Sequence, residues 1–210
     1  MADGLRLEAV TIGKAGTPLL TVDAHVPAGD VLTLMGPSGS GKSTLLSFVM
    51  GDLAPAFSAR GRVTLDGRDL TGLPPEARRV GILYQDPLLF PHLDVAANLA
   101  FGLPRGGTRA ARHATVATAL NDVGLAGYGP RDPATLSGGQ AARVALMRTL
   151  LSRPGALLLD EPFSKLDAGL RDQMRALVFG RAREAGVPVL LVTHDEADAA
   201  AAGGRIVRLG

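Results

Sequence analysis

The sequence predicts an α/β fold with a mostly parallel sheet, a small antiparallel β part at the N-terminus and an inserted helical lobe. Short apolar runs that fit buried strands alternate with helical segments towards both ends of the chain. Residues 156–159 and 187–193 are apolar on both alternating sets of side chains, as in a sheet covered on both faces. Between residues 94 and 153 the strand pattern disappears and only helical segments remain, which predicts the lobe.

The predicted strands follow in order along the chain. Near the N-terminus, two short apolar segments are separated by Gly13, Gly16 and Pro18, which predicts two strands joined by a turn. A continuous apolar run that precedes a glycine-rich loop predicts a buried strand. Strands are expected over residues 5–11, 19–26, 31–35, 62–65, 80–84, 156–159, 187–193 and 205–209.

Helices are expected after the glycine-rich loop, over residues 43–50, within the lobe, and again from residue 168 onwards. Gly106, Gly107 and the segment 127–133 separate the helices of the lobe. A chain of 210 residues can build one sizeable core with a small lobe. We therefore expect one domain over residues 1–210, with a catalytic core at 1–86 and 154–210 and the helical lobe at 87–153.

Composition excludes several classes of site. The chain has no cysteine, so it can form neither disulfides nor thiolate metal sites. Its net charge is +2, and no basic cluster is interleaved with aromatic residues, so we expect no direct nucleic-acid partner. The longest stretch without a charge, residues 31–41, is too short to span a bilayer. The N-terminus lacks the features of a secretion signal, and we expect a cytoplasmic location.

The glycine-rich loop fits the phosphate-binding pattern G-x-x-x-x-G-K-[ST], and it lies between a buried strand and a helix, as that chemistry requires. Glycines let successive backbone N–H groups converge on phosphate oxygens. Lys42 supplies a full positive charge for the β- and γ-phosphates, and the Ser43 hydroxyl suits a Mg²⁺ ligand. The predicted ATP-binding residues are Gly36, Pro37, Ser38, Gly39, Ser40, Gly41, Lys42, Ser43 and Thr44.

A second anchor for a magnesium nucleotide is predicted at the end of the buried strand 156–159. Asp160 follows that strand and can hold Mg²⁺ through water. Glu161 is the next residue, and it points elsewhere, where it could polarise an attacking water as a general base. An apolar strand that ends in Asp-Glu is common by itself, so this interpretation depends on the phosphate loop.

The string Leu136, Ser137, Gly138, Gly139 and Gln140, together with the phosphate loop and Asp160-Glu161, resembles the ATP-binding cassette (ABC) ATPases. The resemblance covers nearly the whole chain and implies a P-loop NTPase (RecA-like) core. Ser137, Gly138 and Gly139 open a predicted helix, so a hydroxyl, free N–H groups and the helix dipole would form an anion site.

The resemblance also implies a head-to-tail homodimer, in which the signature residues 136–140 contact the ATP of the partner chain. It implies ATP and Mg²⁺ as ligands, with Ser43, Gln85 and Asp160 at the metal. Gln85 would sense Mg²⁺ and the attacking water, and His194 would contact the γ-phosphate. With Glu161, these two are the implied catalytic residues, and Asp167 would reach across the dimer.

Within the family, residues 85–99 and 161–167 look most like the separate ATPase subunits of bacterial binding-protein-dependent importers. That similarity implies membrane permease subunits as partners, a solute-binding protein as an indirect partner, and a peripheral location at the cytoplasmic face of the inner membrane. Phe90, Leu93 and Val95 could be apolar anchors for the permease, or they could form the core of the lobe.

The sequence departs from the family at two places that bear on function. No aromatic residue precedes Phe48, so the aromatic that usually stacks on adenine is absent, although Ile12 or its neighbours could give apolar contact. Lys165 stands where a small residue is usual, which bears on the dimer interface.

Two alternatives to transport share the signature motif. The first is a soluble ATPase clamp in DNA repair or chromosome maintenance, which usually carries heptad insertions or zinc modules that do not fit between Gln85 and Leu136. The second is a translation ATPase, which normally holds two cassettes, whereas this chain has one phosphate loop. Import over export is the weaker part of the transport interpretation, and the solute cannot be read from this chain.

Overall fold

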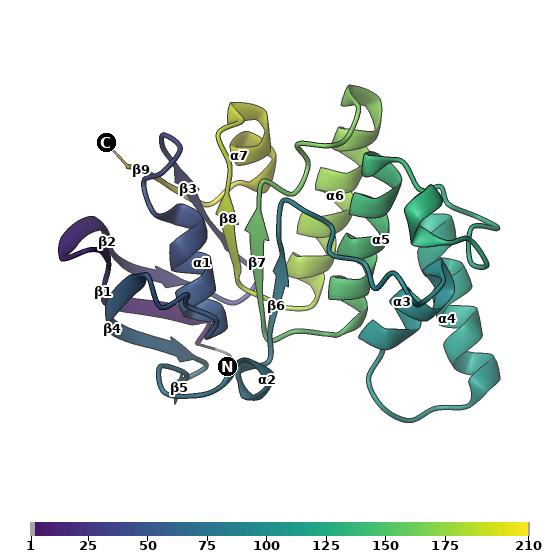
Figure 1. The fold of residues 1–210 in the computed structure, drawn as a ribbon, viewed down its shortest axis with the longest axis horizontal. Coiled ribbons are helices and arrows are strands. Elements are labelled where there is room, and N and C mark those ends of the chain that lie inside the picture. Colours follow the sequence, from purple (N-terminus) through teal and green to yellow (C-terminus); the bar gives the residue numbers. More distant parts are fainter. Residues whose placement is uncertain (1–2, 210) are drawn as a thin grey trace. The chain divides into compact units, whose positions relative to one another are not determined.

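The computed structural model describes residues 3–209, so Met1, Ala2 and Gly210 lie outside it. The chain forms two compact units (Figure 1). Within the described residues, the first comprises residues 3–82, Gly155–Glu161 and residues 175–209, and the second comprises Leu83–Pro154 and Pro162–Met174. This division differs from the expected one mainly at Pro162–Met174, which groups with the helical unit.

The first unit contains an antiparallel sheet in the order β2-β1-β4-β5. Its strands are β1 (Leu5–Lys14), β2 (Thr17–Val26), β4 (Phe57–Leu65) and β5 (Arg68–Asp69). Strands β1 and β4 are longer than their apolar segments predict, because Gly13 and Lys14 pair with Ser58 and Phe57. Alternate residues of β1, including Leu5 and Leu7, are fully buried, as expected for a sheet with one core face.

The second sheet has the order β6-β7-β8-β3-β9. Its strands are β3 (Val31–Met35), β6 (Val80–Leu83), β7 (Ala156–Asp160), β8 (Val189–Val192) and β9 (Arg205–Arg208). Strand β3 runs parallel to β8 and β9, and β7 runs parallel to β8. Every residue of β3, β7 and β8 is buried, which confirms the expected mostly parallel, covered sheet.

Helix α1 (Lys42–Met50) packs between the two sheets of the first unit (Figure 1). Leu45, Leu46 and Val49 are fully buried in one apolar cluster with residues of both sheets. The helix therefore starts at the end of the phosphate loop and is held there by the core. The other helices that include residues of this unit are α2 (Pro75–Arg78), α6 (Ala168–Glu184) and α7 (Glu196–Ala202).

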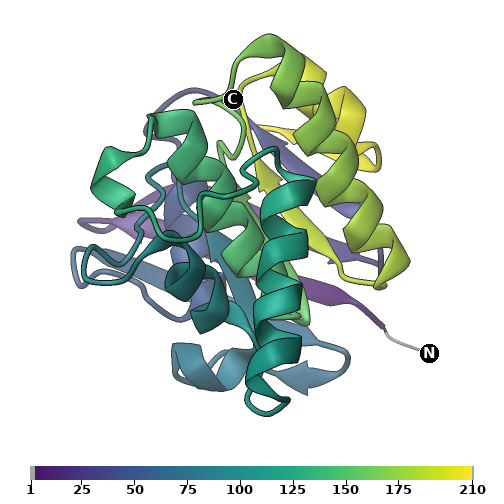
Figure 2. The same ribbon diagram turned by 90° about the vertical axis from the view of Figure 1, so that its right-hand side faces the viewer.

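The second unit is helical, as predicted (Figure 2). It contains α3 (Val95–Gly102), α4 (Arg109–Asp122), the 3₁₀ turn Pro133–Thr135 and α5 (Gly138–Leu151). Asp94 and Thr108 cap α3 and α4 by accepting hydrogen bonds from Ala97 N–H and Ala111 N–H. Among residues 3–209, no helix is long and apolar enough to cross a membrane.

Candidate nucleotide-binding site

The phosphate loop joins β3 to α1, where the sequence predicts it. Gly39 and Gly41 have φ angles of 83° and 90°, a region that side chains rarely adopt. A Cβ atom on Gly41 would also lie 3.0 Å from Leu20 Cδ2 and 3.2 Å from Leu19 Cβ. Gly41 is thus required both by its backbone conformation and by the close approach of β2. The turn leaves the first N–H groups of α1 at the loop.

Lys42, the first residue of α1, folds its side chain back into the loop. Its Nζ donates hydrogen bonds to Gly36 O at 2.9 Å, Pro37 O at 2.8 Å and Ser40 Oγ at 3.2 Å. Although the side chain is long and charged, it is largely buried. Phosphate oxygens could take the place of these oxygens as acceptors for the Lys42 ammonium group. The loop therefore holds a positive charge where an anion would bind.

Asp160 ends β7 next to the phosphate loop and is buried. Burial raises the pKa of this carboxyl group, and a hydrogen bond with the Ser43 side chain and the charge of Lys42 partly oppose that shift. The hydroxyl and the carboxylate are hard oxygen donors, the kind that Mg²⁺ prefers. Residues 3–209 contain no group of three His, Cys, Asp or Glu side chains suited to a metal. A Mg²⁺ ion held by Ser43 and Asp160 would take its remaining ligands from phosphate oxygens and water.

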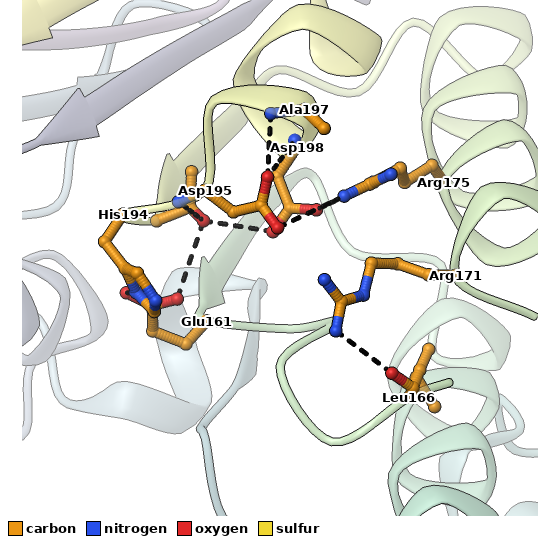
Figure 3. Close-up of polar contacts among 9 residues, drawn as sticks. Glu161, Leu166, Arg171, Arg175, His194, Asp195, Ala197 and Asp198 are labelled. Atoms are coloured by element: carbon orange, nitrogen blue, oxygen red, sulfur yellow. Dashed lines mark hydrogen bonds and ion pairs between the residues drawn. The ribbon is translucent and has the colours of Figure 1, made fainter. Parts of the chain in front are cut away.

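Glu161 has a φ of 49°, which is uncommon for a residue other than glycine and marks a sharp turn after β7. Its N–H donates to Val192 O at 2.9 Å. Its Oε1 lies 2.8 Å from His194 Nδ1 (Figure 3). The Glu161 side chain is 15% exposed and that of His194 is 74% exposed. The hydrogen bond and charge of Glu161 raise the pKa of His194, so the structure brings these two predicted residues together.

A network of charged side chains surrounds this pair, and the sequence did not reveal it (Figure 3). Arg175 donates to Asp198 Oδ1 at 2.7 Å through Nε and makes a second, shorter contact through Nη2. Thr193 Oγ1 donates to Asp198 Oδ2 at 3.0 Å and lies 3.5 Å from Glu161 Oε2. The buried Arg175 and Asp198 thus hold the segment that carries His194. Because the two come from different helices, no local pattern predicts their pairing.

The signature residues lie in the second unit, at the start of α5. Ser137 Oγ accepts a hydrogen bond from Gln140 N–H at 3.3 Å, and Gln140 Oε1 accepts one from Ser137 N–H at 2.9 Å. This reciprocal capping box could have been recognised from Ser-x-x-Gln. The hydroxyl is therefore engaged with the helix. As first-turn residues, Gly138 and Gly139 have N–H groups with no intrahelical acceptor, so they remain suited to an anion.

Gln85 and Asp167 also belong to the second unit. Gln85 is exposed in the loop after β6. Asp167 Oδ1 accepts a hydrogen bond from Leu170 N–H at 3.0 Å at the start of α6. The unusual Lys165 has a partner here, because its Nζ donates to Asp86 Oδ1 at 2.6 Å. The structure thus links two loops of this unit through a residue that the sequence marked only as a departure.

Comparisons with known proteins show which family the chain is similar to. A family model described as ABC transporter matches residues 19–164. The "Uncharacterized ABC transporter ATP-binding protein YnjD" of Escherichia coli (strain K12) is 51% identical over 180 residues, which are 86% of this chain and 83% of that protein. The "Fe(3+) ions import ATP-binding protein FbpC" of Streptomyces coelicolor is 48% identical over 97% of this chain, which spans only 58% of that protein.

A solved structure gives the same result for the fold. It is a dimeric ATP-binding cassette in a post-hydrolysis state, bound to ADP and Pi. The TM-score is 0.85 and the sequence identity is 31%, over 98% of this chain and 94% of that chain.

Proposed function

Because the chain belongs to the ABC transporter family, we propose that it binds and hydrolyses ATP to power a membrane transporter, in particular a solute importer. The observation that carries the proposal is the Glu161–His194 pair, in which Oε1 of Glu161 and Nδ1 of His194 lie 2.8 Å apart. Glu161 directly follows Asp160, which is buried and hydrogen-bonded to the side chain of Ser43. A phosphate-binding loop alone would support binding only. The paired carboxylate and imidazole add the means to move a proton.

Most of the proposed chemistry falls to side chains of the first unit, and Gln85 of the second unit is the exception. Lys42 and the loop N–H groups hold the β- and γ-phosphates. Ser43 and Asp160 fit Mg²⁺, with Gln85 as a further proposed ligand, and the bound ion would shield the charge of the phosphates. Glu161 accepts the proton of the attacking water, because its carboxylate lies beside the site and is held by His194. His194 in turn donates a hydrogen bond to the γ-phosphate.

We place the complete site in a head-to-tail homodimer. Gly138 and Gly139 present N–H groups suited to the phosphates of ATP bound by a second copy, and Asp167 lies on the segment proposed to cross the interface. A similar solved cassette is dimeric in a state bound to ADP and Pi, which supports this arrangement.

The proposed permease surface lies on the second unit. Leu88 is 60% exposed and Phe101 is 66% exposed, which is unusual for large apolar side chains. The rings of Phe101 and Phe90 lie 4.6 Å apart, so they form one apolar patch. Val95, in contrast, is fully buried and belongs to the lobe core, which excludes it as an anchor. A peripheral subunit could bind apolar permease residues here.

A relative named for Fe(3+) import supports import over export. Importers use a solute-binding protein, so that protein is the proposed indirect partner, and the cytoplasmic face of the inner membrane is the proposed location. The relatives that match are named as transport proteins, which favours transport over an ATPase clamp for DNA.

The Glu161→Gln variant tests the proposal, because glutamine keeps the shape of the side chain but cannot accept a proton at neutral pH. We expect ATP hydrolysis to fall by about 10²–10⁴, the usual contribution of a positioned general base. Binding should survive, and two chains should remain joined by ATP in size-exclusion chromatography. Lys42→Ala is the control and should stay monomeric with ATP. Hydrolysis by Glu161→Gln near the parental rate would show that another group is the base.

A further inference from the structure

A second cavity with a cationic lining lies within the helical unit. The loop of residues 103–108 joins α3 to α4 there (Figure 1). Together with the first turns of α4 and with Arg153, this loop lines a cavity of about 300 Å³. Arg105 and Arg112 also line it, and none of the lining residues is acidic. The cavity is therefore positively charged and large enough for a small anion or for the anionic group of a larger molecule.

The sequence around the cavity gives no carboxylate to neutralise these arginines. Residues 95–121 contain three arginines and no Asp or Glu, and the same is true of residues 133–159. The cavity lies where these two segments meet, because Arg153 belongs to the second and the other lining residues to the first. Like charges that face one small space repel each other, so an anion bound there would relieve that repulsion.

The three arginines have different roles in this cavity. Arg112 donates hydrogen bonds to Ala100 O at 2.8 Å and to Pro104 O at 2.6 Å, so it ties the loop to the end of α3. In the part of the chain that the structure describes, the guanidinium groups of Arg105 and Arg153 donate to no protein group. Arg112 therefore shapes the cavity, and the other two are available for a ligand.

Two glycines in the loop add backbone donors. Gly106 and Gly107 have φ angles of 101° and 76°, which residues with a side chain rarely adopt. A Cβ on Gly106 would meet no atom within 4 Å, so a ligand can approach the backbone there. Among residues 3–209, no backbone or side-chain acceptor is bonded to either N–H group. Successive N–H groups in such a turn are suited to an anion.

We propose that this cavity binds a phosphate group, held by the guanidinium groups of Arg105 and Arg153 and by the N–H groups of Gly106 and Gly107. A guanidinium can donate to two phosphate oxygens at once. A phosphate also has more acceptor oxygens than a carboxylate, so it can accept from both arginines and from the backbone together. All of these residues belong to the second unit, whereas the phosphate loop belongs to the first. The inference therefore goes beyond the proposed function and does not depend on it.

Titration with inorganic phosphate tests the site, with the amide NMR signals of Gly106 and Gly107 as the readout. In the parent, both signals should shift and reach saturation. Arg105→Gln and Arg153→Gln should each weaken the phosphate affinity by about fivefold, the size expected for one partly exposed ion pair. Arg109→Gln is the matched control, because Arg109 is exposed at the start of α4 but does not line the cavity. It should bind phosphate like the parent.

The same spectra separate this cavity from the phosphate loop, because phosphate bound at that loop would shift the signals of Gly39 and Gly41 instead. An equal loss of affinity in Arg109→Gln and in the two cavity variants would overturn the inference, since diffuse positive charge would then explain the binding.

A vesicle assay distinguishes a lipid headgroup from a free phosphate compound as the source of the phosphate. The parent and the three glutamine variants are sedimented with phosphatidylcholine vesicles, with and without about a third of phosphatidylglycerol. A headgroup ligand predicts that the anionic vesicles retain the parent and Arg109→Gln better than the two cavity variants. A free phosphate compound predicts saturable NMR shifts with equal sedimentation of all four proteins. Equal sedimentation without any shift at Gly106 and Gly107 would overturn the inference.

Discussion

At the phosphate site, charged side chains are buried and one residue has an uncommon backbone conformation. Lys42 and Asp160 are buried charged side chains, and burial raises the pKa of Asp160. Glu161 has a backbone φ of 49°. Such features cost folding free energy and persist because the surrounding sheet holds them, and they concentrate at functional sites. The site is therefore organised before any ligand binds.

The pairing of His194 with Glu161 predicts a pH effect that can be measured directly. The Glu161 carboxylate raises the pKa of His194 above its usual value of 6.5, so Glu161→Gln should lower it towards that value. Proton NMR titration of the histidine ring signals measures this pKa, and His113, which belongs to the other unit, serves as the internal control. An unchanged His194 pKa in the variant would show that the two side chains do not interact in solution.

The same pair links pH to stability with a definite sign. Because the folded-state pKa of His194 is raised, the pair contributes its full stability below the unfolded-state pKa. That contribution is lost as pH rises through the folded-state pKa of His194. It should be small, because the His194 side chain is 74% exposed and water screens the interaction.

At the scale of elements, helix and strand ends place the functional groups. Strand β7 ends at Asp160, α1 begins at Lys42 and α5 begins beside Ser137. In the helical unit, the buried Asn98 amide donates to Phe90 O at 3.1 Å and Leu93 O at 3.0 Å, which holds the loop before α3. Ends of elements suit this purpose because they carry backbone groups without internal partners.

The cap of α5 predicts a variant with two separable effects. Ser137→Ala removes the acceptor of Gln140 N–H and should destabilise the fold by about 1 kcal/mol. Hydrolysis should fall by more than this loss of stability explains, because α5 also presents the signature N–H groups. Urea unfolding and ATPase assays measure the two effects.

Thr108→Ala is the matched control, since it removes the cap of α4, where Thr108 Oγ1 accepts from Ala111 N–H at 3.2 Å. It should cost similar stability and retain hydrolysis. Equal ATPase losses in the two variants would mean that Ser137 acts only through helix stability.

For the molecule as a whole, the proposed dimer would require that one chain carry two different halves of an ATP site. The phosphate loop, Asp160, Glu161 and His194 belong to one unit, and the signature belongs to the other. In the proposed dimer, each complete site would combine the first unit of one chain with the second unit of its partner. Activity would then depend on association and not on the folded monomer alone.

This arrangement predicts that specific ATPase activity rises with protein concentration. The physical reason is mass action, because a site that needs two chains is more populated as dimerisation proceeds. Steady-state assays over about a hundredfold range of concentration, below saturation of the dimer, measure the effect. A Ser58→Ala variant, changed at an exposed position of β4, should follow the same curve as the parent. A flat specific activity, together with a monomer in size-exclusion chromatography, would contradict the composite site.

The amino-acid sequence was enough to predict the fold class, the phosphate loop, the buried strand that ends in Asp160, and a helix that starts at the signature. Each of these depends on neighbouring residues, because a strand, a tight turn and a helix start have local patterns. The same local patterns predict strands β1 and β4 that are shorter than the observed ones. Pairing between the two strands extends both of them through residues that do not continue an apolar run.

Contacts between residues far apart in the chain became known only from the folded structure. It placed His194 against Glu161, Arg175 against Asp198, and Phe57 beside Lys14. It also buried Val95 while leaving Phe101 exposed, although both are apolar residues of α3. These outcomes depend on strand register and on the orientation in which helices pack, which bring together residues far apart in the chain. No pattern of neighbouring residues encodes those distances, so they emerge only when the core forms.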